Sequence, residues 1–211
     1  MNGAVAVGVF DGVHRGHVAL LERAVQRAAG GPCVAVSFEP HPDIVLARTF
    51  KPLAPLTPLP EKYARFAALG VDLHVLPFTR ELAALEPEVF VQRHLVEPFA
   101  PRWLVVGEDF ALGRGRAGNV ARLRTIGTQH GFEVDALPLL MHGDAAVTST
   151  RVRALLAEGR VAEVAELLGE PYTLAGHVVG GERVGRTLGF PTANLQLHDE
   201  QLVSAHGIYA V

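Results

Sequence analysis

Residues 4–17, AVAVGVFDGVHRGH, place a valine-rich apolar run directly before a glycine-containing turn that carries two histidines. The run 4–10 ends at an Asp-Gly pair, which predicts a buried strand followed by a turn. From residue 16 to 29, apolar residues recur at helical spacing until a Gly-Gly pair ends the pattern. The stretch therefore predicts a strand, a turn and a helix, with His14 and His17 on one side of the first helical turn.

The alternation of strand and helix continues to about residue 168. We expect further strands at 33–38, 73–78, 103–107 and 132–140. We expect further helices at 60–70, 87–99, 119–131, 148–158 and 161–168. Strands that are apolar throughout and alternate with helices predict an α/β fold, in which a parallel sheet is covered on both faces.

The character of the sequence changes after LGEP (168–171). The following segment has Gly, Pro and Thr between short apolar runs and lacks helical spacing, which is typical of antiparallel β structure. We therefore expect a first domain over 1–168 and a second over 169–211. About 40 residues are fewer than a single-core domain usually needs, so we expect the second domain to be incomplete.

Composition and charge exclude several classes of function. A net charge of −3 and a pI near 6.4 argue against a nucleic-acid-binding protein, which needs a basic face. The single cysteine, Cys33, excludes an internal disulfide framework and a Cys-rich zinc site. No apolar run approaches the roughly 18 residues of a membrane span, and residues 1–10 lack the basic start of a signal peptide. We expect a cytoplasmic protein, and its assembly into a homo-oligomer stays open.

The turn after the first predicted strand has the composition of an anion site. Ligands of open parallel sheets bind at the carboxyl ends of the strands, and Gly12 and Gly16 let the backbone approach a ligand closely. The helix that begins near Gly16 points its free N–H groups at the same place, and His14 and His17 add imidazole donors. This combination suits a triphosphate that undergoes nucleotidyl transfer.

Other interpretations of the same residues stay open at this point. The two imidazoles could pack in the core without a ligand. They could also form half of a zinc site, for which His41 is the only nearby third candidate. Asp11, which precedes them, could cap the turn instead of contacting a nucleotide.

A second group of polar residues, VTSTRVRALLAEG (147–159), begins a helix late in the first domain. The hydroxyl residues 148–150 can cap this helix. Arg151 and Arg153 fall in its first turn, the end that disfavours cations, which indicates a compensating anion. A triphosphate held between this helix and the histidine pair would provide that anion. The alternative is a capped helix with two solvated arginines.

Six motifs together carry a family resemblance. In chain order they are GVFDGVHRGH (8–17), FEPHP (38–42), VVGEDF (105–110), TSTRVRALLAEG (148–159), LGEPY (168–172) and GRTLGFPTANL (185–195). As a set that covers nearly the whole chain, they resemble the prokaryotic bifunctional riboflavin kinase/FMN adenylyltransferase family, the FAD synthetases. The resemblance implies a Rossmann-like nucleotidyltransferase domain with a parallel sheet, followed by part of an antiparallel β-barrel kinase domain.

The resemblance also implies roles for individual residues. The residues expected to bind the ATP phosphates are His14, His17, Ser149, Thr150 and Arg153. Those expected to shape the nucleotide pocket are Gly8, Phe10, Asp11 and Gly16, and those expected beside the flavin are Pro40, Pro42 and Asp109. In the kinase part, the expected phosphate loop contains Gly180, Gly185 and Arg186. Thr192 and Asn194 are expected to hold Mg²⁺ and an ATP phosphate through oxygen, which suits this cation.

The implied substrates are ATP, FMN and riboflavin. The terminal phosphate of FMN would attack the α-phosphorus of ATP and release pyrophosphate, with Mg²⁺ neutralising charge and no general base. The chain departs from the family at Ala111 and Leu112, where an arginine and an aromatic residue are usual, which would weaken flavin packing. The catalytic glutamate of the kinase lies further downstream in the family than residue 211, so we expect the kinase activity of this chain to be absent or incomplete.

Two further motifs have an alternative meaning. GRGRAG (113–118) fits a dinucleotide-binding pattern but follows the fourth predicted strand instead of the first, so we expect a basic loop near the active site. GGERVGRT (180–187) nearly fits a P-loop but has no helix after it. Two other functions stay open: a nucleotidyltransferase with another phosphate-bearing acceptor, and a non-catalytic flavin- or nucleotide-binding module.

Overall fold

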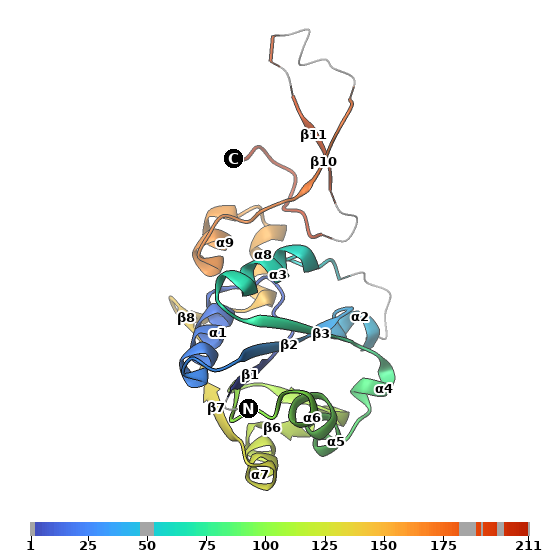
Figure 1. Ribbon diagram of the computed structural model, residues 1–211. Coiled ribbons are helices and arrows are strands. Elements are labelled where there is room, and N and C mark those ends of the chain that lie inside the picture. Colours follow the sequence, from blue (N-terminus) through green and yellow to red (C-terminus); the bar gives the residue numbers. More distant parts are fainter. Residues whose placement is uncertain (1–2, 47–52, 182–188, 191, 198–200, 211) are drawn as a thin grey trace.

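Five parallel strands form the central sheet, and their spatial order differs from their order in the chain. The computed structural model describes residues 3–46, 53–181, 189–190, 192–197 and 201–210 (Figure 1). The strands lie in the order β3-β2-β1-β4-β7. Their bounds are β1 (Ala4–Val7), β2 (Cys33–Glu39), β3 (Asp72–Pro77), β4 (Trp103–Gly107) and β7 (Glu133–Leu137). The order reverses between β1 and β4, so the crevice at their carboxyl ends is the expected ligand site.

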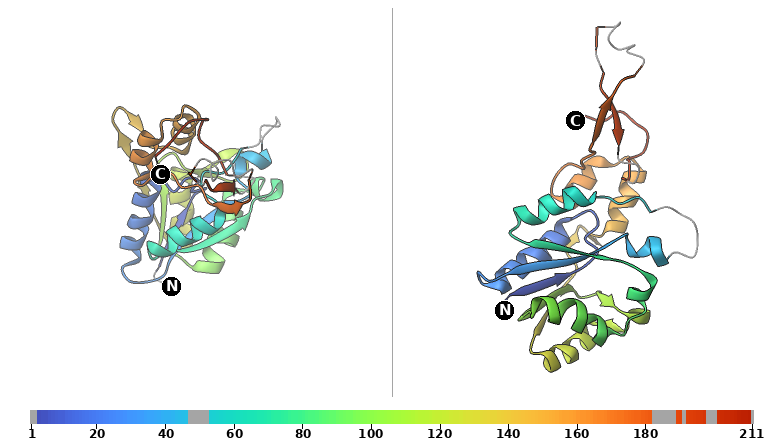
Figure 2. Two further views of the ribbon diagram at one scale, coloured as in Figure 1. Left: turned by 90° about the horizontal axis from the view of Figure 1, so that it is seen from above. Right: turned by 45° about the vertical axis from the view of Figure 1, so that its right-hand side comes forward.

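Helices cover both faces of the sheet, as the sequence predicts (Figures 1 and 2). The helices α1 (Arg15–Ala28) and α3 (Leu59–Ala68) pack on one face. The other face is covered by α5 (Pro87–Val91), a π-helical turn (Gln92–Val96), α6 (Glu97–Phe99) and α7 (Val120–His130). Strand β1 alternates accordingly: Ala4 and Ala6 point into the core below α1, while Val5 and Val7 point into the opposite core. The small side chains let α1 pack close to the sheet.

A third layer of core lies beyond the carboxyl edge of the sheet. It is formed by α8 (Ser149–Ala157) and α9 (Val161–Leu168), which pack around the fully buried Leu56 and Leu156. Short elements complete the fold: α2 (Pro42–Leu46), α4 (Arg80–Ala83), β5 (Ala111–Leu112), a 3₁₀ turn (Arg114–Arg116), β6 (Gly118–Asn119), β8 (Met141–His142) and β9 (Ala145–Ala146). No helix among the described residues is long and apolar enough to cross a membrane.

Three sequence predictions are wrong in their bounds. The predicted strands 4–10 and 132–140 end at Val7 and Leu137, because the last residues of each leave the sheet and line a cavity instead. The predicted helix 87–99 is divided by the π-helical turn, in which the Glu97 N–H bonds the Gln92 carbonyl five residues earlier. Proline at 98 has no N–H to continue the regular ladder, which accounts for the interruption.

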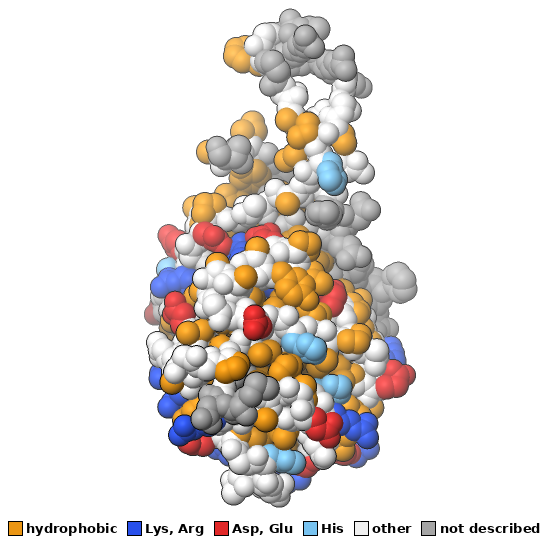
Figure 3. Space-filling view, viewed as in Figure 1, with side chains coloured by type: hydrophobic (Ala, Val, Ile, Leu, Met, Phe, Trp, Pro, Cys, Tyr) orange, Lys and Arg blue, Asp and Glu red, His pale blue; other side chains and the backbone are white. Residues whose placement is uncertain are grey.

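The described part of 169–211 contains one antiparallel ladder, between β10 (Gly176–Val179) and β11 (Asn194–Leu197). Val178 and Leu195 pair in this ladder and are 71% and 52% exposed, so the hairpin has no core of its own among the described residues (Figure 3). Antiparallel structure in this segment is confirmed.

Residues 201–205 leave the hairpin and return to the first domain. The Leu202 N–H donates to the Pro55 carbonyl over 2.9 Å, and the Ala205 N–H donates to the Leu156 carbonyl over 2.9 Å. The Tyr172 hydroxyl donates to the carbonyl of Leu202 over 2.6 Å. Residues on both sides of the predicted boundary at 168 therefore share the third core.

Candidate functional site

The turn between β1 and α1 has an unusual backbone. Phe10 and Val13 have φ of 53° and 40°, in the left-handed region that β-branched and aromatic residues seldom adopt. Gly12 between them has φ of 84°. His14 caps α1, because its Nδ1 accepts the His17 N–H over 3.3 Å. Strain of this kind persists only where the surrounding packing imposes it, which is typical of functional turns.

The two histidines are stacked and neutral. Their ring centroids are 3.6 Å apart and the ring planes differ by 15°. Burial lowers the pKa of His14 to about 4, and burial together with His14 and Lys62 places the pKa of His17 well below its usual value. Because His14 Nδ1 accepts a hydrogen bond, the single proton of its neutral ring lies on Nε2. The pair therefore offers neutral donors at pH 7, not cations.

A cavity of about 390 Å³, here called the histidine cavity, lies between this turn and the start of α8. The predicted residues that line it are Gly8, Phe10, His14, Gly16, His17, Asp109, Ser149 and Thr150. Thr148 caps α8 by accepting the Arg151 N–H over 3.2 Å, which confirms the predicted cap. Two helix N-termini and two imidazoles therefore face one cavity, a combination that favours an anion.

A second cavity of about 590 Å³, here called the aromatic cavity, adjoins the first. Its aromatic lining residues are Phe38, Phe78, Phe90 and Phe110. The two cavities share Val9, Asp109 and Phe110. A planar ring system bound among these phenylalanines would therefore place its polar end toward the histidine cavity.

Several other predicted residues line the aromatic cavity. Pro42 and Asp109 line it, whereas Pro40 lines a smaller neighbouring cavity. Leu112, which stands at the position of a family aromatic residue, also lines it while packing in the core below. The glycine-rich loop 113–118 contributes Arg116, whose guanidinium donates to the Asp109 carbonyl over 3.1 Å.

Arg153 lies beside the site, but its guanidinium bonds protein groups. It donates to the Asp11 carboxylate and to the Ala54 carbonyl. The other Asp11 oxygen accepts the Leu56 N–H over 2.8 Å, and Ser149 Oγ donates to the Asp11 carbonyl over 2.7 Å. Asp11 thus joins the histidine turn to α8 and to the segment before α3, which supports its structural interpretation.

Arg151 is partnered as well. Its guanidinium donates to the carbonyls of His142 and Ala145, both over 3.0 Å. The backbone carbonyls of the β8–β9 hairpin therefore bind this half-buried guanidinium, and an anion at the start of α8 stays a prediction.

The predicted residues of the kinase part are placed only in part. Gly180, Thr192 and Asn194 are exposed, and Asn194 pairs with Val179 in the β10–β11 ladder, one residue before Gly180. Gly185 and Arg186 lie outside the described residues. Among the described residues, no group of three or more His, Cys, Asp and Glu side chains could hold a metal ion, so nothing there supports a zinc site.

Sequence reasoning missed Lys62, a buried lysine at the same edge of the sheet. Its side chain is only 4% exposed, and its Nζ donates to the Val9 carbonyl over 3.1 Å. A signal was present: Lys62 and Phe66 are four residues apart on the inward face of α3, where an apolar residue would be usual.

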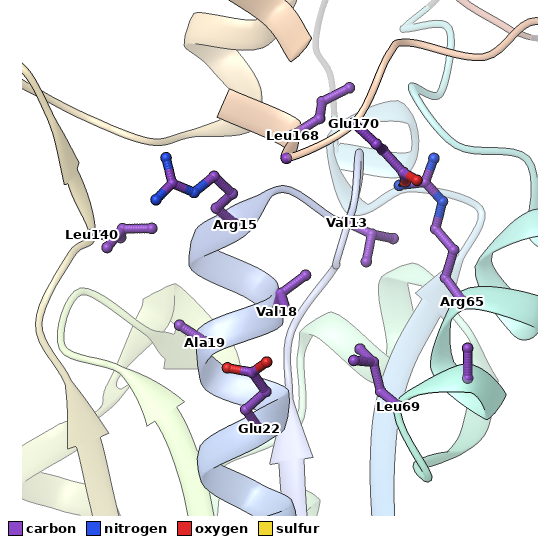
Figure 4. Close-up of a pocket in the computed structure, with 12 residues that line it drawn as sticks. Val13, Arg15, Val18, Ala19, Glu22, Arg65, Leu69, Leu140, Leu168 and Glu170 are labelled. Carbon is purple, nitrogen blue, oxygen red and sulfur yellow. The ribbon is translucent and has the colours of Figure 1, made fainter. Parts of the chain in front are cut away.

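A further groove of about 560 Å³ lies on the outer side of α1 (Figure 4). It runs between α1 and α3 below residues 168–170, and Arg65 and Glu170 form an ion pair over 2.5 Å at its rim. It shares only Leu140 with the histidine cavity, so it is separate from the predicted site.

Comparison with known proteins agrees with this arrangement. The FAD synthetase family model matches residues 1–151, and the riboflavin kinase family model matches residues 168–211. The chain is 37% identical over 214 residues to a bifunctional riboflavin kinase/FMN adenylyltransferase of Listeria monocytogenes and 40% identical over 210 residues to one of Escherichia coli K12. The two alignments include 100% and 98% of this chain, but only 68% and 66% of the length of the relatives.

Among solved structures, the chain is similar to a crystal structure described as a macrolide-efflux protein from Streptococcus pneumoniae. The TM-score is 0.89 at 30% identity, over 98% of this chain and 67% of that one. This likeness confirms the α/β fold with its parallel sheet. On both family models and on relatives that align with all of its described elements, the chain belongs to the bifunctional riboflavin kinase/FMN adenylyltransferase family.

Proposed function

We propose that this chain transfers AMP from ATP to the terminal phosphate of FMN, forming FAD and pyrophosphate. The observation that carries the proposal is the junction of the two cavities, which share Val9, Asp109 and Phe110. An anion site and an aromatic site that meet at one place suit the joining of a triphosphate to a phosphorylated ring system. We assign this activity to residues 1–168 and a part of a riboflavin kinase to residues 169–211.

The histidine cavity would hold ATP. The N-terminal N–H groups of α1, the neutral imidazoles of His14 and His17, and the hydroxyls of Ser149 and Thr150 are the donors for its phosphates. Gly16 leaves room for the His14 ring, since a Cβ at position 16 would lie 3.2 Å from that ring. Arg153 acts at a distance: its bond to Asp11 positions the turn and α8 relative to each other.

The aromatic cavity would hold the flavin ring of FMN. Phe38, Phe78 and Phe110 offer faces and edges for stacking, and Pro42 adds a further apolar contact. Asp109 lines both cavities and would lie between flavin and nucleotide. The ribityl phosphate then extends from the ring toward Val9.

The chemistry needs positioning more than a protein nucleophile. An oxygen of the FMN phosphate attacks the α-phosphorus of ATP, and the bond to the bridging oxygen breaks as pyrophosphate leaves with the electron pair. The nucleophile is already an anion, so no base has to remove a proton. Preorganised donors that line the histidine cavity would stabilise the charge that develops on the phosphoryl oxygens.

Mg²⁺ fits the oxygen-bearing side chains of the histidine cavity. The carboxylate of Asp109 lies at the junction with the aromatic cavity, and the hydroxyls of Ser149 and Thr150 line the histidine cavity itself. This cation prefers oxygen, usually through one or two carboxylates together with substrate phosphates. When bound, it would neutralise phosphate charge during transfer.

In the kinase part, we propose that Thr192 and Asn194 supply oxygen ligands for Mg²⁺ in riboflavin phosphorylation. Gly180, Gly185 and Arg186 would form the phosphate loop. We further propose that the partners of the chain are these small molecules, with no nucleic acid.

The acceptor can be identified by pyrophosphate release. The purified chain is incubated with ATP and Mg²⁺ and with FMN, glycerol phosphate or phosphopantetheine in turn. We expect release with FMN only, because the aromatic cavity offers stacking surfaces that the other two acceptors cannot use. Faster release with another acceptor would identify a different nucleotidyltransferase. Tight FMN binding without release would identify a non-catalytic binding module.

A further inference from the structure

Lys62 is a buried cation that the proposed reaction has not yet used. It lies in the second turn of α3, and its side chain is 4% exposed. Burying an ammonium group is costly unless partners compensate for its lost hydration. Its Nζ donates to the Val9 carbonyl over 3.1 Å. Burial lowers the pKa of Lys62, while the nearby carboxylates of Asp11 and Glu39 raise it and favour the charged form.

Two of the groups around Lys62 already have other donors. The Val9 carbonyl already accepts a hydrogen bond from Ser37 Oγ over 2.9 Å. Asp11 is already paired with Arg153 and also accepts the Leu56 N–H. Lys62 therefore adds a positive charge beside the carboxylates of Asp11 and Glu39, where Ser37 and Arg153 already supply donors. An ammonium group has three N–H bonds and can serve more than one acceptor.

The position of Lys62 indicates a role in binding a ligand. Lys62 lines a third cavity of about 300 Å³, here called the lysine cavity, whose lining also includes the carboxylates of Asp11 and Glu39. Val9, Phe38 and His41 line it too. Those three residues also line the aromatic cavity, so the two cavities adjoin. Val9 lines the histidine cavity as well and is, among the described residues, the one residue common to all three. The Lys62 ammonium bonds the carbonyl of the residue where the three cavities meet.

His41 adds a second donor at the same place. Its Nδ1 accepts the Asp43 N–H over 3.1 Å, which leaves the proton of the neutral ring on Nε2. Burial lowers the pKa of both His41 and His17, and the charge of Lys62 adds to the effect in both.

We propose, on the basis of the proposed function, that Lys62 binds the terminal phosphate of FMN and holds it at the junction of the three cavities, facing the α-phosphorus of ATP. The phosphate is a dianion that must leave water to react, and a fixed ammonium compensates for its lost hydration. Lys62 does not line the histidine cavity, so it serves the acceptor and not the triphosphate.

The test compares FMN with riboflavin, which carries the same ring without the phosphate. Lys62→Met and Lys62→Gln remove the charge, and Lys62→Gln keeps a donor for the Val9 carbonyl. Lys62→Arg keeps the charge. The matched control is Arg65→Met, which removes a cation from the outer side of the same helix. Arg65 pairs there with Glu61 and with Glu170, the second of which is drawn in Figure 4. For each chain we would measure kcat, KM for FMN, KM for ATP, and the inhibition constant of riboflavin against FMN.

We expect the neutral variants to raise KM for FMN by about 10- to 100-fold, the usual effect of a lost hydrogen bond to a charged group. KM for ATP and the riboflavin constant should stay within about twofold, and Lys62→Arg should recover part of the loss. Equal constants in Lys62→Met, Lys62→Gln and Arg65→Met would overturn the proposal. So would equal losses for FMN, ATP and riboflavin with a lower melting temperature, which a structural role predicts.

A binding measurement separates this proposal from the proposed function. The ratio of FMN to riboflavin affinity is measured by titrating flavin fluorescence, which needs no turnover. If the unmodified chain forms no FAD but loses its preference for FMN on Lys62→Gln, the reaction is wrong and the phosphate site stands. If the unmodified chain forms FAD and the ratio is unchanged by Lys62→Gln, the phosphate site is wrong and the reaction stands.

Discussion

His14 and His17 owe their donor chemistry to burial. Each ring is taken out of water at the start of α1, which keeps it uncharged near neutral pH. A neutral imidazole is a weaker hydrogen-bond donor than an imidazolium. The stacking of the two rings, whose centroids are 3.6 Å apart, fixes the direction of each donor.

The first prediction concerns His17. We expect His17→Ala to lower the rate of FAD formation by about 100- to 1000-fold, the usual cost of losing one preorganised donor. The melting temperature should fall only modestly, because the variant loses the ring contacts of His17 with His14 and Phe10 but keeps the cap that His14 supplies. The measurement is steady-state FAD formation. His130→Ala, at the exposed end of α7, is the control, and equal rates in the two variants would contradict the phosphate role of His17.

The second prediction concerns the pH dependence of stability. The pKa of His14 is about 4 in the folded chain and 6.5 as the reference value. Between these values the unfolded chain binds a proton that the folded chain does not, so stability falls as pH is lowered from about 6.5 to 4. Urea unfolding at pH 7.5 and 4.5 should show a loss about 2 kcal/mol larger in the unmodified chain than in His14→Gln. Equal losses would show that His14 titrates normally.

At the scale of single elements, α7 packs very closely against the face of the sheet that it covers together with α5 and α6. Gly127 lies inside this helix, and a Cβ there would be 2.5 Å from the Phe132 carbonyl oxygen and 3.1 Å from the Phe132 ring. The close approach lets α7 pack directly against the start of β7, whose far end leads to the histidine cavity.

The third prediction is that Gly127→Ala destabilises the chain although alanine is the better helix former. Helix propensity would favour the variant by about 1 kcal/mol, but overpacking against a backbone carbonyl costs about 1–3 kcal/mol. We expect a net loss of about 1 kcal/mol in denaturant unfolding. Thr125→Ala, on the exposed side of the same helix, should be nearly neutral. A more stable Gly127→Ala variant would show that the helix can move away from Phe132.

Long periodic elements could be predicted from the sequence, and short ones could not. The five sheet strands and the helices around α1, α3, α7, α8 and α9 follow from apolar spacing. The helices α2 and α4 and the two-residue strands are too short for a period to be visible. Their existence depends on packing: β5 and β6 pair across a loop whose Gly113 has φ of 72°.

The site could be predicted as far as its motifs extend. The histidine turn and the start of α8 come from motifs far apart in the chain, and the sheet brings them to one cavity. What the sequence could not give is the direction of each side chain. Arg153 turns toward Asp11 and Arg151 toward backbone carbonyls, and nothing in a linear pattern distinguishes these partners from a bound phosphate.

At the scale of the whole molecule, residues 169–211 are connected to the first domain by more than a peptide link. The Tyr172 hydroxyl lies 3.1 Å from the Leu56 carbonyl and 2.6 Å from the Leu202 carbonyl. Leu202 packs against the third core, which also supports α8. The segment beyond the proposed boundary therefore packs against α8, whose start lines the proposed nucleotide site.

The fourth prediction follows from this contact. A chain shortened to residues 1–168 should keep FAD formation but unfold at a temperature about 4–8 °C lower, because it loses roughly 2 kcal/mol of apolar burial and hydrogen bonds at Leu56 and α8. Differential scanning calorimetry gives the two temperatures. Tyr172→Phe in the full chain, which loses only the hydroxyl bonds, should lie between them. An unchanged melting temperature would show that the two parts are independent.

The most direct test of the account is incubation of the purified 211-residue chain with FMN, ATP and Mg²⁺, followed by chromatographic separation of flavins and assay of pyrophosphate. We predict FAD and pyrophosphate in equal amounts, since one transfer forms one of each. Riboflavin in place of FMN, in a parallel incubation, should give no FAD, because riboflavin lacks the phosphate that accepts AMP. A chain that is folded and binds both substrates but forms neither FAD nor pyrophosphate would contradict the account.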